Sequence, residues 1–244
     1  LHDLHIEAIE GSLKFPERTV ILIRASYTDL LNLIERSPDI AEFRLAKETS
    51  RFWMELEPAD QFAWVQELLG RLHVNPNTDV SICVFDTGAN NGHPLLKPIL
   101  SDLDCMACNP DWGTEDHTGH GTQMCGITGY GNLQEHLLSS HPVKIHHKLE
   151  SVKILPRDGK NPENLWGYIT QQAVFLAEIQ NPSHHRIHCT AITSPDNRDR
   201  GRPSSWSAAI DALTSGYDDD HRRLLILSCG NAELQELKNY PSSN

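Results

Sequence analysis

Residues 80–88 read Val80-Ser-Ile-Cys-Val-Phe-Asp-Thr-Gly88, a short apolar run that ends on an acid and a glycine. Short apolar runs that are rich in β-branched residues and bounded by turn residues are typical of buried strands. We therefore expect a strand over residues 80–85, with Asp86 at its carboxyl end. This places an acid at the edge of a sheet rather than inside it.

Beyond residue 80 the chain alternates between apolar runs and stretches of helical periodicity. Strands are predicted over 80–85, 150–155, 186–192 and 223–228, and helices after His120 and over 163–180 and 204–213. Strands separated by helices favour right-handed crossovers and a parallel sheet that is covered on both sides. The predicted fold class is therefore α/β, a doubly wound parallel sheet with helices on both faces.

The first 76 residues have a different pattern. Strands are predicted over 19–24 and 42–45, and helices over 29–36 and from Pro58 to Leu72. The polar stretch Asn75-Pro-Asn-Thr-Asp79 then favours a turn. We expect a small α+β segment over residues 1–76, ahead of a domain over residues 77–244. The pattern suits either a prodomain-like segment or an ordinary N-terminal extension.

Two further motifs join the first one. Residues 116–122 read Asp116-His-Thr-Gly-His-Gly-Thr122, and residues 228–231 read Ser228-Cys-Gly-Asn231. Asp86 and Asn231 each follow a predicted strand, and in open parallel sheets sites form beyond the carboxyl ends of the strands. His120 can act as a general base, Asp86 can hold its tautomer, and the Asn231 amide can stabilise an oxyanion. The chain has no second Asp-Thr-Gly, which an aspartic protease would need.

These three motifs, in this order, resemble the Asp, His and Asn boxes of the subtilisin-like serine proteases, the subtilases of peptidase family S8. The resemblance covers residues 80–231. It is greatest to a bacterial, cytoplasmic-type branch, on the stretches Leu149–Pro156 and Arg200–Ala208. It implies a subtilisin-like fold, serine endopeptidase activity on peptide or protein substrates, no required cofactor and a cytoplasmic location. By family analogy alone, it also implies a regulatory ATPase partner.

The sequence departs from the family where the nucleophile is expected. Residues 1–244 contain no Gly-Thr-Ser box, and the available hydroxyls lack a glycine-flanked context. The stretch Thr190-Ala-Ile-Thr193 replaces the usual Ser-x-Gly, so side-chain preference cannot be carried over. We expect a fragment that is inactive alone. The alternative is a degenerate, non-catalytic subtilase module used for binding or regulation.

Composition excludes several other classes. The formal net charge of −12 argues against nucleic acid or anionic lipid as a partner. No apolar run reaches the ~18 residues that a membrane span requires. No metal site is expected, because Cys105-Met-Ala-Cys108 has no second ligand pair and the pairs His146-His147 and His184-His185 suit solvated loops. Most of the six cysteines are expected to be buried free thiols, including Cys83, Cys189 and Cys229.

Overall fold

The computed structural model describes residues 6–46, 50–194 and 202–230 of the chain, and Asn231 lies outside these residues. The chain divides into two compact units, Leu1–Glu55 and Leu56–Asn244. The division falls earlier than the expected boundary at residue 76, because the helix that begins at Pro58 folds with the second unit.

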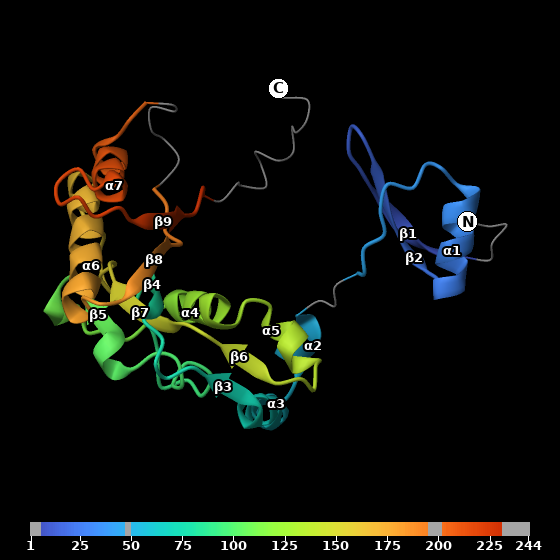
Figure 1. Cartoon of the computed structure of the whole chain (residues 1–244), viewed down its shortest axis with the longest axis horizontal. Coiled ribbons are helices and arrows are strands. Elements are labelled where there is room, and N and C mark those ends of the chain that lie inside the picture. Colours follow the sequence, from blue (N-terminus) through green and yellow to red (C-terminus); the bar gives the residue numbers. More distant parts are fainter. Residues whose placement is uncertain (1–5, 47–49, 195–201, 231–244) are drawn as a thin grey trace. The chain divides into compact units, whose positions relative to one another are not determined.

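Residues 6–46 of the first unit form a hairpin followed by a helix (Figure 1). Strand β1 (Glu7–Lys14) pairs antiparallel with β2 (Thr19–Arg24), and helix α1 (Tyr27–Arg36) follows. Ser26 begins α1 with a capping box, in which its side chain accepts from the Asp29 N–H at 3.2 Å. The short helix α2 (Arg51–Glu55) ends the unit. Residues 42–45, predicted as a strand, have no strand structure, and none of the strands in the described residues pairs with them.

The second unit is built on a five-stranded sheet in the order β5-β7-β4-β8-β9, and every neighbouring pair is parallel. Its strands are β4 (Val80–Asp86), β5 (Cys105–Ala107), β7 (Lys148–Lys153), β8 (His185–Thr190) and β9 (Leu224–Leu227). The central strand is β4, the apolar run that ends at Asp86. The predicted parallel α/β sheet is confirmed.

Helices cover both faces of this sheet (Figure 1). Helix α4 (His120–Tyr130) contributes to the buried cluster that contains Val84 on one face. Helices α6 (Trp166–Gln180) and α7 (Ser205–Ser215) contribute to the cluster that contains Phe85 on the other face. Because adjacent residues of β4 point to opposite faces, a single strand anchors both layers.

Shorter elements complete the unit. Helix α3 (Pro58–Gly70) buries Leu68 completely in the α4-side cluster, which explains why residues 56–76 fold here. A second, two-stranded parallel sheet joins β3 (Leu72–Val74) to β6 (Val143–Ile145). The remaining elements are helix α5 (Leu133–Leu137) and the 3-10 turns Asp102–Asp104, Pro110–Trp112 and Glu163–Leu165.

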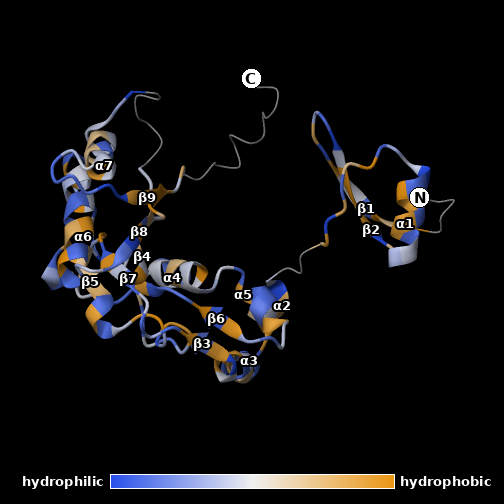
Figure 2. Cartoon of the chain, in the orientation of Figure 1, coloured by the Kyte–Doolittle hydropathy of each residue, from blue (hydrophilic) through white to orange (hydrophobic). Residues whose placement is uncertain are grey.

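Strand β9 is apolar and lies at an edge of the main sheet (Figure 2). Leu224, Ile226 and Leu227 are between 44% and 56% exposed. Cys229, expected to be buried, is exposed just beyond this strand, whereas Cys83 is fully buried in β4. In the described residues, no helix has the length and apolar character needed to cross a bilayer.

Candidate active site

Two of the three expected site residues meet where a strand ends and a helix begins. Asp86 is the last residue of β4, and His120 is the first residue of α4. The His120 Nδ1 atom lies 2.9 Å from each oxygen of the Asp86 carboxylate. The Asp86 side chain is fully buried, whereas the His120 side chain is 49% exposed. The expected contact between Asp86 and His120 is therefore present.

The Asp86 carboxylate is held in one orientation by the next residue. Its Oδ1 atom accepts from the Thr87 backbone N–H at 2.7 Å, and the Thr87 hydroxyl lies 3.1 Å from the same oxygen. An ionised carboxylate that faces Nδ1 favours the tautomer with the proton on that nitrogen. The half-exposed imidazole of His120 then has Nε2 free to accept a proton. This is the arrangement that a general base requires.

Two glycines beside His120 let the Asp86 and His120 loops approach each other. Gly119, the N-cap of α4, has a φ of +86°, a left-handed conformation that glycine adopts without strain. Gly121 lies so close to the other loop that an added Cβ would be 2.1 Å from the Gly88 carbonyl oxygen. The same Cβ would lie 3.2 Å from the Asp86 Cβ. The Gly-His-Gly sequence thus permits the short Asp86–His120 distance.

A matched pair of glycine substitutions tests this close approach. Gly121→Ala is expected to destabilise the chain by about 1–3 kcal/mol, because the backbone must move to relieve overpacking. Gly126→Ala, in the same helix, meets nothing within 4 Å and should be neutral or stabilising by about 0.5–1 kcal/mol. Urea unfolding of both variants measures the difference. Equal stability of the two would contradict the steric argument.

A buried lysine donates hydrogen bonds to the loop before His120. The sequence analysis did not single out this residue. Lys153 is fully buried at the end of β7, in register with Asp86. Its ammonium donates to the carbonyl oxygens of Trp112 at 3.1 Å and Glu115 at 2.8 Å. The sequence did contain a sign of this role, because Lys153 lies inside the apolar run of residues 151–155. A charged side chain is rarely buried in a strand without polar partners, so its position indicated that such partners exist.

The other sequence candidates do not join this site. Burial is the main cause that raises the pKa of the Cys105 and Cys108 thiols to about 12, which disfavours the thiolates that bind metals. Among the described residues, no group of three or more His, Cys, Asp or Glu side chains could hold a metal ion. His184, expected in a solvated loop, instead lies 3.1 Å from the buried Glu150 carboxylate.

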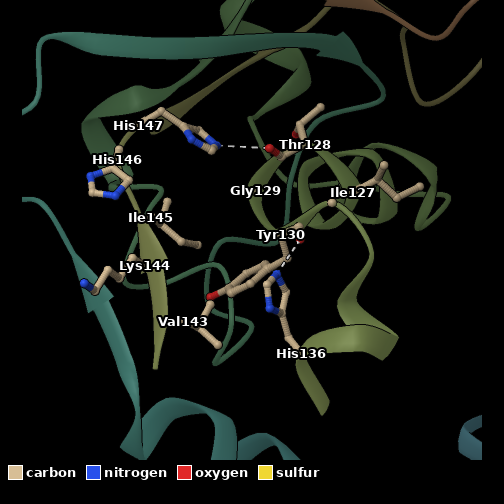
Figure 3. Close-up of a pocket in the computed structure, with 11 residues that line it drawn as sticks. Ile127, Thr128, Gly129, Tyr130, His136, Val143, Lys144, Ile145, His146 and His147 are labelled. Carbon is tan, nitrogen blue, oxygen red and sulfur yellow. Dashed lines mark hydrogen bonds between the residues drawn. The ribbon is translucent and has the colours of Figure 1, made fainter. Parts of the chain in front are cut away.

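A cavity of about 380 Å³ lies at the opposite end of α4 (Figure 3). Its lining includes His136, whose Nε2 lies 3.0 Å from the Tyr130 carbonyl oxygen, and His147, whose Nε2 lies 3.0 Å from that of Thr128. Both imidazoles therefore satisfy carbonyl groups in the last turn of the helix. The cavity includes neither Asp86 nor His120, and it is separate from the candidate site.

Comparison with known proteins shows the family of the chain. The family model described as the subtilase family, Peptidase_S8, matches residues 77–244. The matched range contains Asp86, His120 and the sequence position of Asn231. A search of curated proteins found no match.

Proposed function

The chain belongs to the subtilase family of serine peptidases, and we propose that it carries the acid–base half of a serine endopeptidase site. The observation that carries the proposal is the pairing of His120 Nδ1 with the buried Asp86 carboxylate at 2.9 Å. Peptides or proteins are the substrates that the family implies.

In the proposed reaction, a serine outside residues 1–244 attacks the carbonyl carbon of a peptide bond. His120 Nε2 accepts the serine proton, and Asp86 stabilises the imidazolium that forms. His120 then gives the proton to the leaving amine, and water hydrolyses the acyl-enzyme in a second round. Asn231, by resemblance to the family's Asn box, would donate a hydrogen bond to the oxyanion. No step requires a cofactor.

The arrangement of the sheet supports this proposal. Asp86 ends β4 at the carboxyl edge, where parallel sheets place their sites. A substrate strand would bind by adding its main chain beside the sheet. The cytoplasmic location and the ATPase partner stay predictions from the resemblance.

A fluorophosphonate probe, which reacts with activated serines, tests the proposal. We expect the 244-residue chain to remain unlabelled and a longer chain with a Gly-Thr-Ser box to be labelled. His120→Ala should abolish that labelling, because the serine loses its base. His146→Ala is the matched control, since His146 is exposed and lies outside the candidate site.

The outcomes separate the two functions. Labelling of the 244-residue chain itself would show that the nucleophile lies within residues 1–244 and would contradict its proposed position. A longer chain that folds, contains the serine box and fails to label would favour the non-catalytic module.

A further inference from the structure

Asp116 is a second buried carboxylate beside the Asp86–His120 pair, and each of its two carboxylate oxygens accepts more than one hydrogen bond. The residue is only 8% exposed. Its Oδ1 atom accepts from the backbone N–H groups of Thr118 at 2.9 Å and Gly119 at 3.0 Å. Its Oδ2 atom accepts from the Thr122 N–H at 2.8 Å and the Thr122 hydroxyl at 2.7 Å. Asp116 thereby holds the residues on both sides of His120.

The same carboxylate reaches the neighbour of Asp86. The Thr87 hydroxyl lies 2.8 Å from Asp116 Oδ1 and 3.1 Å from Asp86 Oδ1, and it accepts from the Gly121 N–H at 3.2 Å. A hydroxyl has one proton to donate, and the shorter distance is the one to Asp116. With that proton committed to Asp116, Asp86 is left to accept from the Thr87 backbone and from His120.

The backbone of Asp116 is tied to the loop after β4 by a second set of bonds. Its N–H donates to Asn90 Oδ1 at 3.1 Å, and the Asn90 side chain donates to the Asp116 carbonyl oxygen at 3.3 Å. The Asn90 N–H donates to the Thr122 hydroxyl at 3.1 Å. The loop that carries Asp86 and the turn that carries His120 are therefore connected through Asp116 and its partners.

Asp116 is ionised in this arrangement. Burial alone would raise the pKa of its carboxyl, but the hydrogen bonds from Thr122, Thr118 and Thr87 outweigh burial and hold that pKa well below its usual range. Charge-assisted hydrogen bonds are stronger and shorter than neutral ones. The network therefore fixes geometry more firmly than neutral side chains could.

We propose that Asp116 is the positioning residue of the site, which fixes His120 against Asp86 by clamping Thr87 and the first turn of α4. Asp116 touches neither the imidazole nor the substrate in this role. The proposal rests on the proposed function for its catalytic meaning. The claim that Asp116 fixes the position of His120 relative to Asp86 depends only on the contacts of the described residues.

The test is proton NMR of the 244-residue chain, through the His120 Nδ1–H signal. Because this proton points at a buried carboxylate, it is expected to exchange slowly enough to be seen, and its absence in His120→Ala assigns it. Asp116→Asn is expected to broaden or abolish the signal, because an amide has one acceptor oxygen and its NH₂ group would face the Thr122 donors. Asp111→Asn is the matched control, since Asp111 is exposed and its side chain accepts no hydrogen bond from the described residues. Circular dichroism verifies that each variant is folded.

An unchanged His120 signal in a folded Asp116→Asn chain would overturn the proposal. If that variant does not fold, Thr122→Val decides, because it removes one donor to Asp116 and leaves Asp86 and His120 untouched. A shifted or broadened signal then supports the proposal, and an unchanged one overturns it.

In a longer, active chain, Asp116→Asn should lower kcat by about 10²-fold with little change in KM. If the unaltered longer chain is not labelled by the fluorophosphonate probe, the proposed function is rejected, whereas the NMR result on the 244-residue chain still stands.

Discussion

Asp86→Asn is expected to lower kcat by about four orders of magnitude in a longer chain that carries the nucleophile, the typical cost of a wrong histidine tautomer in a serine protease. The Thr87 N–H at 2.7 Å holds Oδ1 in place, so the amide NH₂ group would replace Oδ2. That NH₂ group would face His120 Nδ1, which lies 2.9 Å from Oδ2. Although Nδ1 lies equally close to Oδ1, at 2.9 Å, a donor NH₂ group at the same distance favours an Nδ1 that accepts, with the proton on Nε2. His120 could no longer take a proton from serine.

Steady-state hydrolysis of a peptide substrate measures this effect. Asp79→Asn is the matched control, because Asp79 is an exposed aspartate just before the opposite end of the same strand. The control should retain kcat within a few-fold. A loss of less than about tenfold for Asp86→Asn would contradict the role of Asp86 as the residue that fixes the tautomer.

The sequence predicted the elements whose pattern is local and strong. The apolar run before Asp86 and the helical periodicity of residues 163–180 gave β4 and α6 with small shifts in their bounds. Strand β1 (Glu7–Lys14) was missed, because its charged residues and its exposure on both faces leave no apolar alternation to detect. The three-residue strands β3 and β6 were missed because they are too short to show a period.

The site was predictable in part for a similar reason. Asp86 and His120 lie in motifs whose glycines and order indicate their chemistry, and the expected role of each residue predicted the contact between them. The hydrogen bonds of Lys153 and Asp116 could not be predicted, because they depend on which backbone carbonyl and N–H groups of the loops face these side chains after folding. His184 was misassigned because its partner, Glu150, lies on another strand. Asn231 lies outside the described residues, so its role stays a prediction.

Glu150 and Arg186 form a buried ion pair, and removing one partner should strongly destabilise the second unit. The Glu150 side chain is fully buried and that of Arg186 is 5% exposed. Arg186 donates to both Glu150 oxygens, at 2.6 Å from Nε and 3.0 Å from Nη2. The Asn181 side chain donates to Glu150 at 3.0 Å as well. The pair therefore joins β7 to β8 and to the turn after α6.

Arg186→Met is expected to destabilise the chain by about 3–5 kcal/mol, because it leaves the Glu150 charge buried and without its main partner. Urea unfolding measures the loss, and Arg222→Met, an exposed arginine in the same unit, should stay within about 0.5 kcal/mol. The double variant Glu150→Leu/Arg186→Met should recover most of the stability, because replacing both charges by apolar side chains removes the desolvation penalty along with the attraction. The unfolding free energies of the unaltered chain, Arg186→Met, Glu150→Leu and the double variant together give the coupling between the two residues. Two results would contradict this account: a loss of unfolding free energy below about 1 kcal/mol for Arg186→Met, or a double variant that is less stable than Arg186→Met. Either one would show that leaving the Glu150 charge unpaired is not the cause of the destabilisation.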